Sequence, residues 1–142
     1  MTTLYLDTSS AIKLYVSQDG SEEVRQRVAS ASVIATSVVT YAESRAALAR
    51  LRREGAMTAA DLKSARSQLD EQWPRFVAVL ATNALCQAAG DYAERYGLRG
   101  FDSIHLASFA EIARRAGPRE TQFSSYDRRL NDAARKLARR LK

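Results

Sequence analysis

Short apolar runs alternate along this chain with longer segments of helical periodicity. The runs lie at residues 2–6, 33–36 and 76–81, and a weaker, more polar run lies at 121–125. The first three are largely apolar, which is typical of strands buried on both faces. Segments with helical spacing, bounded by capping or breaking residues, lie at about 8–16, 21–29, 38–54, 58–73, 83–96, 101–115 and 127–142.

Strands that alternate with helices predict right-handed crossovers and a parallel sheet covered by helices on both faces. The predicted fold class is therefore α/β, a three-layer sandwich with a short central parallel sheet. At 142 residues the chain has the size of one ordinary domain. We expect residues 1–142 to form a single domain that ends in a basic helix.

The net charge of the chain is +6, and the excess is concentrated at its end. Residues 128–142 contain seven basic residues and one acid, Asp132, so the remaining residues sum to zero. Such a segment can lie along a nucleic-acid backbone. A solvated helix face explains the same charge about equally well, so charge alone does not decide between the two interpretations.

The sequence also indicates where in the cell the protein is expected and which kinds of metal site it excludes. No apolar run approaches the ~20 residues of a membrane span, and the first residues lack the basic start and apolar stretch of a secretory signal. The expected location is the cytoplasm. Cys86 is the only cysteine, which excludes an internal disulfide and a cysteine-rich metal site. We expect Cys86 to be a small core residue.

Four acidic residues fall near the positions where open α/β sheets bind ligands, outside the carboxyl ends of the strands. Asp7 follows the first predicted strand directly, and Asp127 follows the fourth. Glu43 lies about two turns into the helix after the second strand, and Asp102 lies in the first turn of the sixth helix. Helix capping is an alternative role for Asp7 and Asp127, and Asp102 also suits a helix N-terminus. Glu43 gains nothing from a helix dipole at its position.

Four carboxylates at one sheet edge repel one another unless something compensates their charge. Two charges ~5 Å apart repel by ~3 kcal/mol at an effective dielectric constant of ~20. Either some of the acids are protonated or a cation lies among them. Because oxygen ligands without a cysteine or histidine cluster favour Mg²⁺ or Mn²⁺ over Zn²⁺, we predict a magnesium (or manganese) site. Its predicted residues are Asp7, Glu43, Asp102 and Asp127.

His105 is the only histidine and lies one helical turn after Asp102. Packing or a hydrogen bond in the helix interior is its favoured role, ahead of assistance to the acidic site. A pair of histidines for acid–base cleavage of RNA is therefore absent from the sequence.

Four segments carry a family resemblance, namely LYLDTSSAIKLY, TSVVTYAESRAAL, GFDSIHLASFA and FSSYDRRL. In this order and spacing, across residues 4–130, the chain resembles PIN-domain ribonucleases, and among them the VapC-type toxins of toxin–antitoxin pairs. The resemblance implies that the same four acids hold Mg²⁺ or Mn²⁺. It also implies small hydroxyls near the acids, at the positions of Ser9, Ser103 and Ser125.

The resemblance further implies an RNA substrate, often tRNA or ribosomal RNA, a cognate antitoxin that blocks the site, and a homodimer. Members of the family often end with a fifth strand after the last helix. Here the final segment, ARKLARRLK, predicts a helix and no strand.

The function expected from these observations is a Mg²⁺-dependent endoribonuclease that hydrolyses RNA phosphodiester bonds. Asp7 and Asp102 are expected as primary metal ligands, and Glu43 and Asp127 as additional ones. Because water rather than the ribose 2′-hydroxyl would attack, cleavage is expected to leave a 5′-phosphate. The alternatives are a non-catalytic binding module of the same fold and a structure-specific DNA nuclease.

Overall fold

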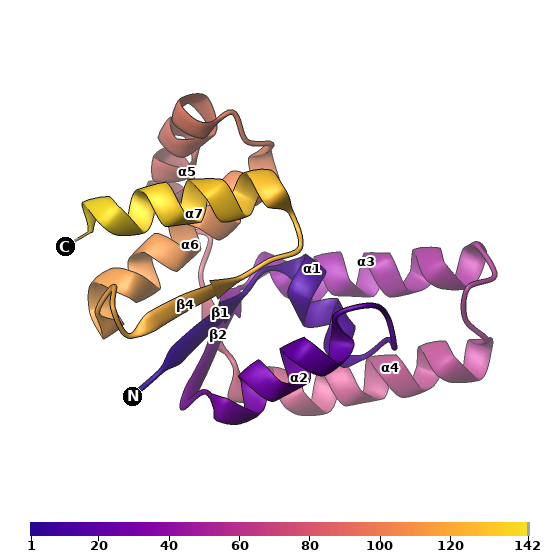
Figure 1. Ribbon diagram of the computed structural model, residues 1–142. Coiled ribbons are helices and arrows are strands. Elements are labelled where there is room, and N and C mark those ends of the chain that lie inside the picture. The colour runs from indigo at the N-terminus through magenta and orange to yellow at the C-terminus, as the bar shows by residue number, and fades with distance from the viewer. Residues whose placement is uncertain (142) are drawn as a thin grey trace.

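The computed structural model describes residues 1–141 and contains a four-stranded parallel sheet (Figure 1). Its strands are β1 (Thr3–Leu6), β2 (Val33–Ser37), β3 (Val77–Val79) and β4 (Thr121–Ser124). The strand order is β3-β2-β1-β4, so β1 lies inside the sheet with β2 and β4 on its two sides. The α/β fold class with a short parallel sheet is confirmed, and so is the weak strand predicted at 121–125.

The helices agree closely with the predicted segments. Their bounds are α1 (Thr8–Ala11), α2 (Ser21–Ser30), α3 (Val39–Arg53), α4 (Ala59–Gln72), α5 (Asn83–Tyr96), α6 (Gly100–Ala116) and α7 (Arg128–Arg140). The helix predicted at 8–16 is instead the short α1 followed by a 3-10 turn, Ile12–Leu14. The segment predicted without a fifth strand forms the second half of α7 up to Arg140, and no strand follows it within residues 1–141. Lys142, the last residue of the predicted helix, lies outside the described residues.

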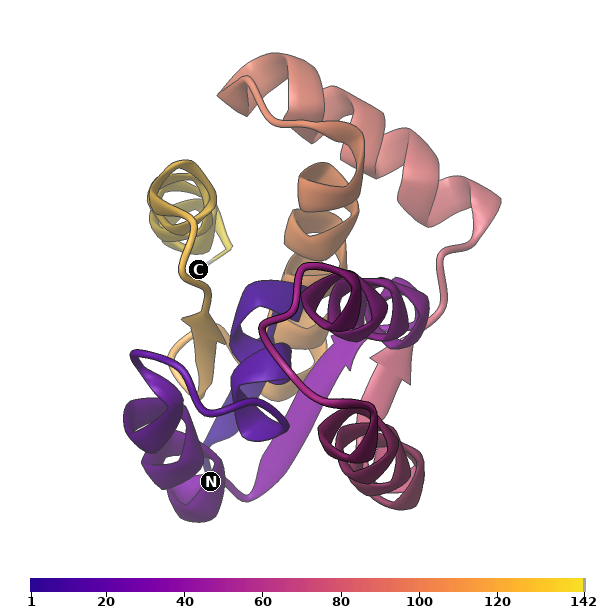
Figure 2. The same cartoon turned by 90° about the vertical axis from the view of Figure 1, so that its right-hand side faces the viewer.

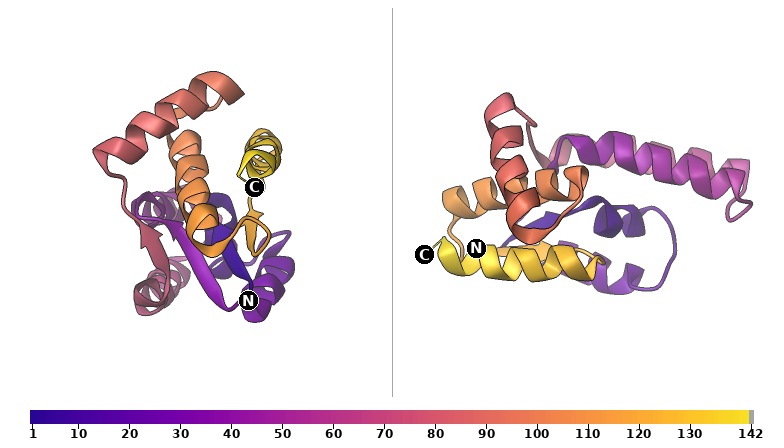
Figure 3. Two further views of the ribbon diagram at one scale, coloured as in Figure 1. Left: turned by 90° about the vertical axis from the view of Figure 1, so that its left-hand side faces the viewer. Right: turned by 90° about the horizontal axis from the view of Figure 1, so that it is seen from above.

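Helices cover both faces of the sheet and make three layers (Figures 1 and 2). On one face, Tyr5 and Ala35 pack with residues of α5, α6 and α7 such as Phe109 and Leu130. On the other face, Leu4 and Leu6 pack with Ala11 of α1 and Val24 of α2. The helices α3 and α4 form a hairpin that extends away from the sheet (Figure 3). Leu48 of α3 and Leu69 of α4 belong to a separate apolar cluster, which also includes Ile12 and Tyr15.

Two expectations about burial are wrong, and both depend on where an element lies in the fold. The strand β3 was expected to be buried on both faces, but it is an edge strand and Val77 is 47% exposed. Cys86 was expected in the core, but it lies on the exposed side of α5. No helix in the described residues is long and apolar enough to cross a membrane.

The register of the sheet positions the candidate site. Tyr5 is paired with Ala35 on β2 and with Phe123 on β4, and Leu6 is paired with Ser124. Because the strands are parallel, the residues that follow them lie at the same edge. Asp7 therefore leaves the centre of the sheet next to the segment that carries Ser125 and Asp127.

Candidate active site

Asp7 is the most buried of the four predicted acids, with only 4% of its surface exposed. It is the N-cap of α1, and its carboxylate accepts a hydrogen bond from the Ser10 backbone N–H at 3.0 Å. The hydroxyls of Ser9 and Ser125 donate to its two oxygens at 2.7 and 2.6 Å. The capping role considered from the sequence is thus present, and two further donors hold the same carboxylate.

The electrostatic environment of Asp7 disfavours its negative charge. Burial raises the pKa of Asp7 above its ordinary value, and the hydrogen bonds from Ser125, Ser9 and Ser10 offset only part of this effect. Within residues 1–141 no lysine or arginine forms a salt bridge with Asp7. A cation beside this carboxylate would therefore stabilise its ionised form.

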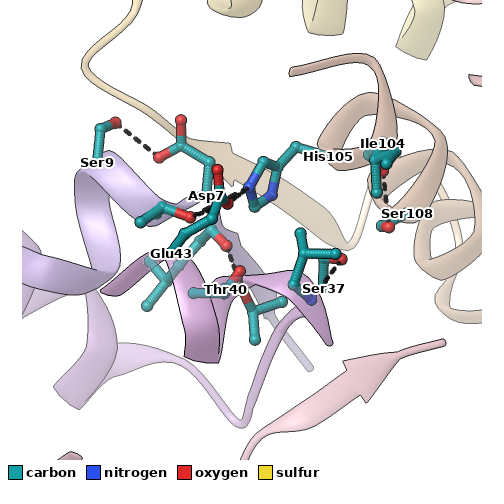
Figure 4. Close-up of polar contacts among 12 residues, drawn as sticks. Asp7, Ser9, Ser37, Thr40, Glu43, Ile104, His105 and Ser108 are labelled. Carbon is teal, nitrogen blue, oxygen red and sulfur yellow. Dashed lines mark hydrogen bonds and ion pairs between the residues drawn. The ribbon is translucent and has the colours of Figure 1, made fainter. Parts of the chain in front are cut away.

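Glu43, on α3, lies against α1 and α6 through two hydrogen bonds to the same oxygen (Figure 4). Its Oε1 is 2.9 Å from His105 Nε2 and accepts from the Thr8 hydroxyl at 2.5 Å. Burial acts to raise the pKa of Glu43, but the contacts with His105 and Thr8 outweigh it and lower that pKa. Glu43 is therefore ionised at neutral pH. It lies about one turn after the start of α3 at Val39, closer to the helix N-terminus than the two turns expected from the sequence.

Asp102 and Asp127 lie on the other side of the site, and Arg99 lies between them. The Arg99 guanidinium is 3.3 Å from Asp102 and 3.8 Å from Asp127. The Asp102 and Asp127 side chains are 23% and 35% exposed, while that of Arg99 is 83% exposed. Asp127 is also the N-cap of α7, where it accepts from the Leu130 N–H at 2.9 Å.

The four predicted acids surround one end of the sheet and are joined through other groups. Ser125 joins Asp7 to Asp127, because its hydroxyl donates to Asp7 and accepts from the Asp127 backbone N–H at 3.0 Å. Arg99 joins Asp127 to Asp102. Within residues 1–141, no three acidic, histidine or cysteine side chains are grouped closely enough to hold a metal ion as they stand. Their role as metal ligands remains a prediction.

Two residues that contact these acids, Thr8 and Arg99, had no place in the sequence interpretation of the site. A third, His105, was considered there with packing as its favoured role, and the structure places it against Glu43. Their spacing carried a signal, since Thr8 directly follows Asp7, and Arg99 and His105 lie one turn before and after Asp102. Of the three serines, Ser9 and Ser125 do contact Asp7. Ser103 instead donates to the Gly100 carbonyl at 2.6 Å.

The donor set of the site fits a hard divalent cation. Its charged groups are carboxylates and its neutral groups are hydroxyls, which match the oxygen preference of Mg²⁺ and Mn²⁺. Asp7 is a buried carboxylate that has no salt bridge to a lysine or arginine among residues 1–141. The positive charge beside Asp102 and Asp127 is the Arg99 guanidinium. Because the Arg99 side chain is exposed, it can move into solvent and free the two carboxylates.

Comparison with known proteins agrees with this fold. A family model described as the PIN domain matches residues 4–136. The chain therefore belongs to the PIN-domain family.

Similar proteins identify the part of the family to which the chain is related. Ribonuclease VapC45 of Mycobacterium tuberculosis strain CDC 1551 / Oshkosh and Ribonuclease VapC49 of strain ATCC 25618 / H37Rv are each 31% identical to it over 134 residues. The alignment covers 94% of this chain and 90% of each relative. The resemblance to VapC-type PIN-domain proteins is confirmed.

Proposed function

We propose that this protein is an endoribonuclease that hydrolyses RNA phosphodiester bonds with Mg²⁺ or Mn²⁺, and that it is the toxin of a toxin–antitoxin pair. The observation that carries the proposal is Asp7, a nearly buried carboxylate at the end of strand β1 that has three hydrogen-bond donors and, within residues 1–141, no salt bridge to a lysine or arginine. Glu43, Asp102 and Asp127 lie at the same end of the sheet. The two VapC relatives, both named ribonucleases, support the same activity.

Asp7 and Asp102 are the proposed primary ligands, and Glu43 and Asp127 would complete the site directly or through water. When bound, the ion would supply positive charge that stabilises the transition state at the scissile phosphate. Arg99 would have to leave Asp102 and Asp127 for the ion to reach them. Its 83% exposure makes this a side-chain movement rather than a change of fold.

The protein groups around the acids would fix the orientation of the ligands. Ser9, Ser10 and Ser125 hold Asp7, and Thr8 and His105 hold Glu43. Because these hydrogen bonds restrict the Asp7 and Glu43 side chains, part of the ordering that the site needs would be complete before substrate binds.

The helix α7 supports a nucleic-acid substrate. It begins at Asp127 and carries exposed basic side chains along its length, namely Arg128, Arg129, Arg135, Lys136, Arg139 and Arg140. Its apolar side, which includes Leu130 and Leu137, is buried in the core. The basic face therefore starts at the acids and can follow a phosphate backbone away from them.

The nucleophile we propose is water. The only histidine is engaged with Glu43 and Tyr5, so no histidine pair is present to activate the ribose 2′-hydroxyl. The products are then a 5′-phosphate and a 3′-hydroxyl. A 2′,3′-cyclic phosphate would contradict the proposed reaction.

The test is cleavage of end-labelled RNA by the purified protein with Mg²⁺, Mn²⁺ or EDTA, followed by analysis of the new termini. We expect cleavage with either metal, none with EDTA, and none with Asp7→Asn. The matched control is Asp91→Asn, which removes one exposed carboxylate from α5 and should cleave like the parent. RNA binding without cleavage of any RNA under these conditions would favour the non-catalytic alternative.

DNA of the same sequence in the same assay tests the second alternative. We expect little or no cleavage, and a preference for flapped or branched DNA would favour a structure-specific DNA nuclease.

We also propose a cognate antitoxin, a homodimer and action in the cytoplasm, as in the proteins that the chain resembles. Co-expression with the product of a neighbouring short reading frame should yield a complex that no longer cleaves RNA. Light scattering of the free protein should give twice the chain mass of 15.7 kDa.

A further inference from the structure

The contacts of Glu43 continue into the hydrophobic core through His105 and Tyr5. Glu43 Oε1 is 2.9 Å from His105 Nε2, and His105 Nδ1 is 2.9 Å from the Tyr5 hydroxyl. Tyr5 is fully buried and His105 is 2% exposed. Two hydrogen bonds in series therefore run from the middle of β1, through α6, to a carboxylate on α3.

The hydrogen-bonding capacities of these groups determine where the protons lie. An ionised carboxylate only accepts, so His105 Nε2 has to donate to Glu43. In a neutral imidazole Nδ1 then accepts the proton of the buried Tyr5 hydroxyl, and both ring nitrogens are paired. In the opposite tautomer the lone pair of Nε2 would face the Glu43 carboxylate. The Thr8 hydroxyl, 3.2 Å from Nε2, could donate to that lone pair only by giving up its hydrogen bond to Glu43.

The packing around Tyr5 is too tight for its hydroxyl to move in response to a different tautomer of His105. Its ring is stacked on Phe123 with centroids 5.6 Å apart and planes at 8°, and it meets the edge of Phe109 at 6.2 Å. Its backbone lies inside the sheet between β2 and β4. The position of the hydroxyl is thus determined by the core, independently of the acids.

We propose that Tyr5 and His105 are positioning residues that lock the imidazole in its Nε2–H tautomer and thereby hold Glu43 in place for metal binding. This inference rests on the proposed function, in which Glu43 is a ligand. Thr8 donates to the same Oε1, and Oε2 accepts no hydrogen bond within residues 1–141. Glu43 Oε2 is therefore the oxygen that the arrangement leaves for the ion.

The first test reads the tautomer directly. His105 is the only histidine, so ¹⁵N spectra of the imidazole contain one pair of ring signals without an assignment problem. We expect a protonated Nε2 and an unprotonated Nδ1 in the parent, and a mixture of tautomers in Tyr5→Phe. A protonated Nδ1 with an unprotonated Nε2 in the parent would overturn the inference.

The second test measures Mn²⁺ affinity by titration of the folded protein. Tyr5→Phe removes one oxygen from a ring that stays packed, and it should weaken Mn²⁺ binding about 3- to 10-fold, as expected for one hydrogen bond. His105→Ala should weaken binding further. His105→Gln, whose side-chain amide can still donate toward Glu43, should recover part of the loss.

The matched control is Tyr15→Phe. Tyr15 is also buried, and its hydroxyl donates to Gln72 at 2.9 Å in the core around α3 and α4. The Tyr15→Phe variant should lose about as much stability as Tyr5→Phe but keep the Mn²⁺ affinity of the parent protein. If a folded Tyr5→Phe protein binds Mn²⁺ as tightly as the parent, the inference is wrong and the proposed function stands. If the parent binds no Mn²⁺ and cleaves no RNA, the proposed function fails and the inference fails with it.

Discussion

The Ser125 hydroxyl lies 2.6 Å from Asp7 Oδ2, although 118 positions separate the two residues in the chain. The parallel pairing of β1 with β4 brings them together, since Leu6 is opposite Ser124 and each functional residue directly follows its strand. The same hydroxyl accepts from the Asp127 N–H. One small side chain thus aligns two candidate ligands from opposite ends of the sequence.

Ser125→Ala should therefore affect the site more than a serine-to-alanine change nearby. Removing this donor leaves one Asp7 oxygen without its partner in a buried place, and we expect a loss of about 1–3 kcal/mol in the free energy of unfolding. RNA cleavage should fall at the same time. Ser103→Ala is the control, because Ser103 donates to a backbone carbonyl, and it should keep parental cleavage. Equal cleavage by both variants would contradict a role for Ser125 at Asp7.

Asp7→Asn should abolish metal-dependent cleavage and yet stabilise the protein in metal-free buffer at neutral pH. Burial raises the pKa of Asp7 in the folded state, so protonation favours folding. That stabilisation is complete below the ordinary value of 3.8 and is lost as the pH rises through the folded pKa. Asparagine keeps the shape without the charge.

Thermal unfolding of both proteins as a function of pH, with EDTA present, checks this prediction. The advantage of Asp7→Asn should be largest near pH 7 and should shrink as the pH falls toward 4. An advantage that grows on acidification would mean that the folded-state pKa of Asp7 is lowered.

Arg99→Gln should strengthen Mn²⁺ binding. The guanidinium competes with a metal ion for Asp102 and Asp127, and exposed ion pairs of this kind contribute at most about 1 kcal/mol. The expected gain in affinity is therefore no more than about 5-fold. Titration with Mn²⁺ measures it, with Arg95→Gln, an exposed arginine on α5, as the control. Weaker binding by Arg99→Gln would show that Arg99 supports the ligands instead of competing with the ion.

Replacing Arg135, Lys136 and Arg139 with glutamine should weaken RNA binding and reduce its salt dependence. Each lost phosphate contact lowers the slope of log K against log salt by about 0.7–0.9. The matched control replaces three exposed arginines at the end of α3, Arg50, Arg52 and Arg53, and so changes the net charge equally. Binding assays at several salt concentrations separate the two. An equal loss in both variants would indicate net charge rather than a surface on α7.

Much of the fold followed from local signals that the sequence carries by itself. The bounds of α5 agree with prediction because Thr82 caps its first turn and Gly97 closes it in the left-handed conformation. The parallel sheet followed from the alternation of apolar runs and helical segments. The placement of Asp7 and Asp127 at one edge followed from their positions after strands, directly after β1 for Asp7 and three residues after β4 for Asp127.

The contacts within the site were decided only by the tertiary structure. The sequence does not state which helix face meets which, so it did not reveal that His105 lies against Glu43 or that Arg99 lies between Asp102 and Asp127. Nor does it state strand order, and β3 is partly exposed because it lies at an edge. Periodicity reports which residues of one element are buried, whereas partners across elements are determined by packing among segments far apart in the chain.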